Sequence, residues 1–151
     1  MSRLEYRLYA EGSETYPLLY YYDRIGKDEV LLRFACDYFI KDGRVYEKTS
    51  CAVEASCYVI YVQEAEDERV MPLWGTPKGF SRRAITMELR EYQEGTADYP
   101  LIRTFSFPDP QEALLHLQAN YLMVGDTEWC RTSAEIDEDR ETYVFYAVPN
   151  H

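Results

Sequence analysis

The chain has 151 residues and a hydrophobic fraction of 46%, which allow one domain with a sizeable core and exclude a disordered chain. Its 27 acidic and 16 basic residues give a formal net charge of -11, which opposes the cationic, phosphate-tracking surface that nucleic-acid binding requires. No segment approaches the ~20 apolar residues of a transmembrane helix, and the N-terminus has no signal-peptide core, so we expect a cytoplasmic protein without a membrane partner.

Most of the chain has the pattern of β-strands. Alternating apolar and charged residues predict a first strand at Leu4–Leu8, and an apolar run predicts a second at Leu18–Tyr22. From Val30 to Ile40 every second residue is apolar, which predicts a long strand. The turn pair Asp42-Gly43 follows and leads into Val45, which indicates a β-hairpin.

One helix is predicted in the second half of the chain. Asp109 is a suitable N-cap, Pro110 suits the first helical position, and Glu112 completes a capping box. Apolar residues at helical spacing continue to Val124, and Gly125 ends the helix. Further strands are expected at residues 57–62, 85–89, 101–107 and 143–148, and no internal repeat is recognised.

These elements predict an α+β fold in a single domain covering residues 1–151. We expect a mostly antiparallel sheet of about seven strands, with one main helix near residues 110–124 packed on it. A strongly curled sheet or an open barrel around that helix fits the same pattern. Without Cys-x-x-Cys pairs, the four cysteines are expected to be reduced and to hold no metal: Cys36, Cys51, Cys57 and Cys130.

Several catalytic classes lack their residues. His116 is the only internal histidine, and no nucleophile-elbow sequence is present to pair with it. Neither Gly-x-x-x-x-Gly-Lys-Ser/Thr nor Gly-x-Gly-x-x-Gly occurs, so no phosphate-cradling loop is indicated. We therefore name no catalytic residue and expect neither a metal nor a cofactor.

One segment concentrates positive charge in this acidic chain. Residues 73–83 read Leu-Trp-Gly-Thr-Pro-Lys-Gly-Phe-Ser-Arg-Arg, with three cations and no acid. Its glycines and proline predict a loop, and exposed backbone amides beside cations suit a phosphate or carboxylate. The predicted ligand-binding residues are Trp74, Lys78, Arg82 and Arg83.

A short motif begins in this loop and continues beyond it. It consists of Trp74, Pro77-Lys78-Gly79 and Met87–Gly95, which reads Met-Glu-Leu-Arg-Glu-Tyr-Gln-Glu-Gly. In this motif the chain resembles the Nudix hydrolases. The resemblance implies a Mg²⁺-dependent phosphohydrolase in which Glu88 and Glu91, placed on a helix, hold the metal. Met87 stands where the family has arginine, and residues 85–89 alternate as in a strand, so the secondary structure here tests the resemblance.

Three hypotheses for the function follow. The first is a non-enzymatic binding or regulatory domain that acts on a protein partner or a small anionic ligand. The second is the degenerate Nudix-like hydrolase. The third is an acidic inhibitor or mimic that docks through two acid-rich stretches, Glu64–Glu68 and Glu135–Glu141, expected to be solvated hairpin loops. Strand edges also suggest a homodimer.

Overall fold

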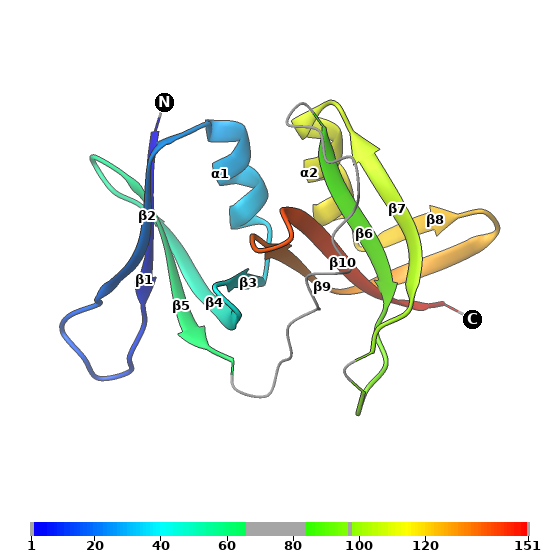
Figure 1. The fold of residues 1–151 in the computed structure, drawn as a ribbon, viewed down its shortest axis with the longest axis horizontal. Helices are drawn as coiled ribbons and strands as arrows, with labels where there is room; N and C mark the ends of the chain where they lie inside the picture. The colour runs from blue at the N-terminus through cyan, green and yellow to red at the C-terminus, as the bar shows by residue number, and fades with distance from the viewer. Residues whose placement is uncertain (1, 66–83, 97, 151) are drawn as a thin grey trace.

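The computed structural model describes residues 2–65, 84–96 and 98–150, and no helix among them is long and apolar enough to cross a membrane. They form ten strands and two short helices (Figure 1). In chain order the elements are β1 (Ser2–Leu8), β2 (Leu18–Ile25), α1 (Lys27–Phe34), β3 (Tyr38–Lys41), β4 (Arg44–Val53), β5 (Tyr58–Glu64), β6 (Ile85–Glu91), β7 (Leu101–Phe107), α2 (Pro110–Gln118), β8 (Tyr121–Val124), β9 (Thr127–Asp137) and β10 (Thr142–Pro149).

All ten strands belong to one mixed sheet. Its order is β2-β1-β5-β4-β3-β9-β10-β6-β7, and β8 pairs with β9 outside this path. Three pairs are parallel: β1 with β5, β10 with β6, and β3 with β9. The prediction of a mostly antiparallel sheet of about seven strands is therefore wrong. Alternation along one strand does not reveal its neighbour, and these parallel pairs join strands far apart in sequence.

The helices also differ from the prediction. The first half of the predicted long strand, from Val30 to Phe34, belongs instead to helix α1, which has acids in its first turn and an ion pair from Glu29 to Arg33 one turn later. Asp109 caps α2 as predicted by accepting a hydrogen bond from the amide of Gln111. This helix ends at Gln118, and the apolar residues beyond it form β8.

The chain is built from two copies of one structural unit. The first unit (residues 2–64) and the second unit (residues 85–149) each contain a hairpin, a helix and three further strands, in that order. In each, the last strand pairs in parallel with the first: β5 with β1, and β10 with β6. The units occupy the two halves of the molecule in Figure 1.

The amino-acid sequence carries the same repeat, so the interpretation of a chain without one is wrong. Residues 9–18 read Tyr-Ala-Glu-Gly-Ser-Glu-Thr-Tyr-Pro-Leu, and residues 92–101 read Tyr-Gln-Glu-Gly-Thr-Ala-Asp-Tyr-Pro-Leu. Adding 83 to a residue number up to Glu54 gives its counterpart, so Gly12 corresponds to Gly95, and both have a positive φ, 78° and 81°. The final strands correspond as Tyr-Val-Ile-Tyr-Val from Tyr58 and Tyr-Val-Phe-Tyr-Ala from Tyr143.

Local geometry is repeated in detail. The register of β4 with β5 shifts at Thr49, and the register of β9 with β10 shifts at its counterpart Thr132. Each threonine hydroxyl donates to a carbonyl oxygen of the neighbouring strand, at 3.2 Å to Tyr61 and 3.0 Å to Tyr146. Because these residues also correspond, the same bulge bends both units.

Each helix is held at its C-terminal end in the same way. The Nζ atom of Lys48 donates to the carbonyl oxygen of Phe34 at 2.7 Å, and Nε of Arg131 donates to that of Leu117 at 2.9 Å. A cation at this end satisfies an unpaired carbonyl and complements the helix dipole. The repeat thus extends to how each helix is anchored to its sheet.

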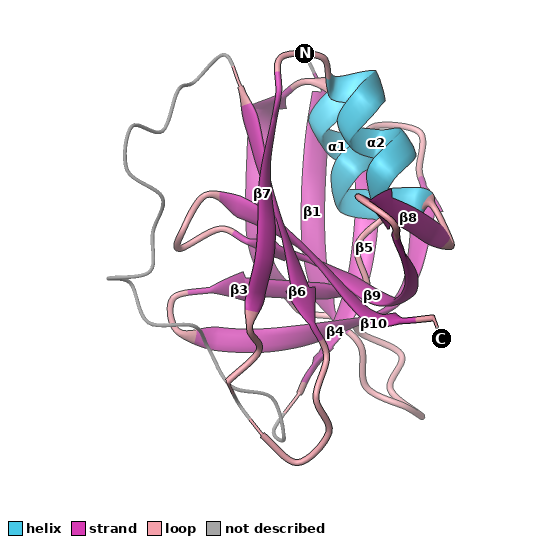
Figure 2. Cartoon of the chain, turned by 90° about the vertical axis from the view of Figure 1, so that its right-hand side faces the viewer, coloured by secondary structure: helices cyan, strands magenta, loops and turns pink. Residues whose placement is uncertain are grey.

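The two units join head to tail. β3 of the first unit pairs with the end of β9, with Tyr38 opposite Glu135. The carboxylate of Asp139, in the β9–β10 turn, accepts hydrogen bonds from the amides of Asp42 and Gly43, both at 2.8 Å. The helices α1 and α2 lie side by side above this junction (Figure 2). The first unit contributes its β3–β4 end and the second its β9–β10 end, so the contacting surfaces are different parts of the unit.

Candidate functional site

The predicted basic loop lies outside the described residues. This applies to Trp74, Lys78, Arg82 and Arg83 alike. The prediction that they bind an anion therefore stays a prediction.

The Nudix-like stretch adopts a geometry different from the one that the resemblance implies. Residues 85–91 form strand β6, not a helix. Glu88 is buried and accepts hydrogen bonds from Arg140, at 2.7 and 3.1 Å, and from Arg90, at 2.9 Å. Burial alone would raise the pKa of Glu88, but these two guanidinium groups outweigh it and hold that pKa below its ordinary value. Glu88 thus neutralises the chain's own cations.

The repeat gives another origin for the same residues. Met87-Glu88-Leu89-Arg90 corresponds to Leu4-Glu5-Tyr6-Arg7, and the glutamate-glycine pair at Gly95 corresponds to the pair at Gly12. In both units the arginine donates through Nε to the glutamate two residues before it, at 2.9 Å. The motif thus belongs to the structural unit.

The second acid-rich stretch is not a solvated loop. Residues 135–137 are the buried end of β9, and Glu138 begins the turn that meets the first unit. Burial opposes ionisation of Glu138, but Lys41, Tyr22 and Arg33 all donate to its carboxylate and hold its pKa below the ordinary value. Glu138 thus binds the chain's own cations across the junction, whereas Asp137 pairs with Arg140 of its own hairpin.

His116 and the cysteines have structural surroundings. The ring of His116 lies against Phe107 and Phe105, with centroid distances of 4.5 and 5.5 Å. All four cysteines are free thiols, and burial raises the pKa of Cys36. Within the described residues, no group of three or more His, Cys, Asp or Glu side chains is placed to hold a metal ion.

A cavity of about 700 Å³ lies where the two units meet, and we call it the seam pocket. Its walls come from α1, from the start of β6, and from the β9–β10 hairpin. The lining residues are Gly26, Asp28, Glu29, Leu32, Arg33, Ala84, Ile85, Thr86, Pro110, Ile136, Glu138, Glu141 and Tyr143. Each unit supplies part of the wall, so the pocket exists only because the units are joined.

Arg33 is the buried cation of the seam pocket. Its terminal nitrogens donate to Glu138 at 2.8 Å and to the hydroxyl of Tyr6 at 3.3 Å. Its Nε atom is buried without a hydrogen bond, although it lies 3.4 Å from the carboxylate of Glu29. At that distance the attraction to Glu29 is electrostatic and the Nε–H is left unsatisfied.

Two further carboxylates line the pocket. Among the described residues, the side chains of Asp28 and Glu141 have neither an ion pair nor a hydrogen bond. Counting only the residues that the structure describes, the pocket has four acidic side chains near two cations, Arg33 and the Lys41 that contacts Glu138. Apolar side chains lie beside these groups: Leu32, Ile136 and Tyr143. An excess of negative charge next to apolar surface suits a cation carried on an apolar stem, as in lysine or arginine.

Sequence reasoning missed the seam pocket because it placed Arg33 on a strand and Glu138 in a solvated loop. Two signals were present. Glu29 and Arg33 have the i, i+4 spacing of a helical ion pair, and the repeat aligns α1 with the well-marked helix α2.

Comparisons with known protein families, with curated proteins and with solved structures gave no match for this chain.

Proposed function

We propose that the protein is a non-enzymatic binding domain that receives a lysine or arginine side chain of a protein partner in the seam pocket. The observation that supports this proposal is the pair of carboxylates of Asp28 and Glu141, which have no ion pair with any described residue and lie beside the apolar side chains of a 700 Å³ cavity. A basic side chain would bury its methylene groups against Leu32 and Tyr143 and bring its charge to these acids.

The overall charge supports the same class of partner. A net charge of -11 attracts basic proteins over a distance and speeds their encounter with the acidic pocket. We also propose a cytoplasmic setting, which the four free thiols support.

The anionic ligand of the first hypothesis is tied to the basic loop and stays open. The described residues favour a cation because the acids of the seam pocket outnumber its cations. An anion at this pocket would have to displace Glu138 from Arg33, leaving a partly buried carboxylate with fewer partners.

Three small probes of similar shape test the proposal by NMR titration. Nα-acetyl-lysine amide carries the cation, Nα-acetyl-norleucine amide replaces it with an apolar end, and Nα-acetyl-glutamate amide replaces it with an anion. We expect the lysine probe alone to shift the side-chain NMR signals of Leu32 and Ile136. Both side chains are buried in the pocket wall, so nonspecific binding of a charged probe to the protein surface should not shift them.

A double variant, Asp28→Asn with Glu141→Gln, provides the matched control because it removes charge and keeps shape. It should weaken binding of the lysine probe about tenfold or more, as expected for losing two charge-assisted contacts. Equal binding of the lysine and norleucine probes, or preference for the glutamate probe, would show that the proposed ligand class is wrong.

A further inference from the structure

The ends of the molecule expose the counterparts of residues that are buried at the junction. Leu32 and Ile40 of the first unit are 2% and 0% exposed at the junction. Their counterparts in the second unit, Leu115 and Met123, are both 63% exposed. Since the units share one fold, the exposed pair marks a surface that is covered in the first unit and open in the second.

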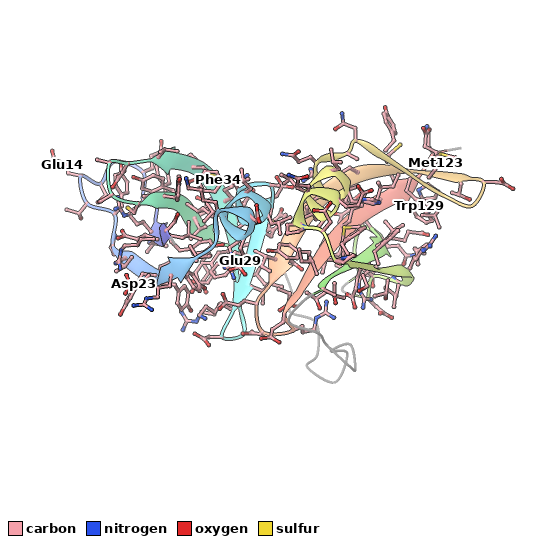
Figure 3. The ribbon with its side chains drawn as sticks, turned by 90° about the horizontal axis from the view of Figure 1, so that it is seen from above. Glu14, Asp23, Glu29, Phe34, Met123 and Trp129 are labelled. Atoms are coloured by element: carbon pink, nitrogen blue, oxygen red, sulfur yellow. The ribbon has the colours of Figure 1, made fainter. Side chains whose placement is uncertain are left out.

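The opposite surface shows the same contrast. Ile136 of the second unit is 5% exposed where it meets β3. Its counterpart Val53, near the end of β4, is 72% exposed. Figure 3 shows Met123 at one end of the molecule and Asp23, which lies beside Val53 in a surface hollow, near the other end. Each end of the molecule thus presents one half of the junction.

Unpaired backbone lies next to these side chains. In the described part of the chain, β8 pairs only with β9, whereas its counterpart β3 pairs on both sides. The end of β4 likewise pairs only with β5, whereas the end of β9 pairs with both β10 and β3. Edges with free amides and carbonyls and exposed apolar side chains are suited to strand addition.

A hollow at the β4 end completes the match. It has a volume of about 370 Å³, and its lining includes Ser2, Arg3, Val53, Glu54 and Tyr58. Four of these correspond to residues 85, 86, 136 and 143, which form the second unit's wall of the seam pocket. In the seam pocket that wall faces Leu32 and Arg33 of α1. The hollow at Val53 is thus half a seam pocket that lacks its helix.

We propose that a second copy of this chain docks here head to tail, repeating the junction between the units. Its β8 adds in parallel to the end of β4, with Tyr121 opposite Ala52 and Leu122 opposite Val53, as Tyr38 lies opposite Glu135 and Phe39 opposite Ile136. Its α2 brings Leu115 over the hollow.

The contact joins two different surfaces, so a docked pair still has one free β4 end and one free β8 end. Such a heterologous contact extends into chains or closes into rings, and it does not stop at a symmetric dimer. The chain's own junction is the template for the contact, which is why a second copy is the occupant and not an unrelated partner.

Sedimentation velocity on three samples tests this proposal. The wild-type chain should form species larger than a dimer as its concentration rises from micromolar to millimolar. Val53→Lys and Met123→Lys should each weaken association by about tenfold or more, because each damages one of the two required surfaces. Both side chains are exposed, so folding should persist, which circular dichroism checks.

Mixing the two variants distinguishes head-to-tail docking from other arrangements. The intact β8 end of Val53→Lys should bind the intact β4 end of Met123→Lys and give a 1:1 dimer that grows no further. Leu101→Lys, on the edge strand β7 that takes part in neither proposed contact, should associate as the wild type does. A monomeric wild type, a dimer that persists in Val53→Lys, or a mixture without dimer would each overturn the proposal.

Discussion

The two units of this molecule have the same fold, and equivalent residues in them have very different surroundings. Arg7 and Glu5 form an ion pair that is partly open to solvent, whereas their counterparts Arg90 and Glu88 are buried beside Arg140. Leu32 is in the core, and its counterpart Leu115 is exposed. The strands and bulges of a unit are therefore specified within that unit. Which of its surfaces are buried depends on its contacts with the other unit.

The largest expected difference between the units concerns buried charge. Arg140→Ala would leave Glu88 and Asp137 buried with fewer cationic partners, and removing one partner of a buried ion pair costs about 3–5 kcal/mol. Arg7→Ala, in the more open network of the first unit, should cost less than about 1 kcal/mol. Urea unfolding of both variants measures the difference, and equal losses would contradict the comparison.

Equivalent leucines should differ almost as much. Leu32→Ala removes a buried side chain at the junction, with an expected loss of about 2–5 kcal/mol in the free energy of unfolding. Leu115→Ala changes an exposed side chain and should stay within about 0.5 kcal/mol of wild type. Both are measured at low protein concentration, where chains are separate. A large loss for Leu115→Ala in dilute solution would mean that it already packs within the single chain.

Acid should weaken the junction between the two units. The pKa of Glu138 is lowered in the folded protein, so its contribution is present above the ordinary glutamate pKa and is lost as pH falls through the folded value. Glu138→Gln should cost about 1.5–3 kcal/mol at neutral pH, as for hydrogen bonds to charged groups, and less at an acidic pH well below the ordinary glutamate pKa. Urea unfolding at both pH values measures this.

Glu112→Gln is the matched control for that experiment. Glu112 is an exposed glutamate on α2, so its substitution should change stability little at either pH. If Glu138→Gln cost the same at both pH values, the ion pairs across the junction would not be the source of the acid sensitivity.

The smallest effects should be equal in the two units. Thr49→Ala and Thr132→Ala each remove the hydroxyl that bonds across the bulge, and each should cost about 0.5–1.5 kcal/mol. Thermal unfolding of the two variants should give similar shifts. A large loss for one threonine alone would indicate that the bulges, despite their shared geometry, support their units differently.

Local sequence signals predicted some elements well. The cap and proline of α2 placed the start of that helix correctly, and the Asp42-Gly43 turn joins β3 to β4. Alternation predicted β1 and β6. These features depend on a few neighbouring residues, which one sequence shows directly.

The remaining features depend on contacts between distant residues. The alternation through Val30, Leu32 and Phe34 fits a strand, and α1 forms because its Leu32 packs at the junction and Lys48 anchors its end. Parallel pairing and the seam pocket require knowing that β3 meets β9. Two sequence signals point to these features: the i, i+4 spacing of Glu29 and Arg33, and the repeat of residues 9–18 at 92–101, which aligns the helices of both units.

The claim that each end of the molecule is one half of a junction can be tested most directly by hydrogen exchange. Amide exchange would be followed in dilute and concentrated samples for β8 and for residues 52–54, with the edge strand β7 as reference. We predict that rising concentration slows exchange in β8 and in residues 52–54 together, and leaves β7 unchanged. Slowing confined to β8, or no slowing at either end, would contradict the account.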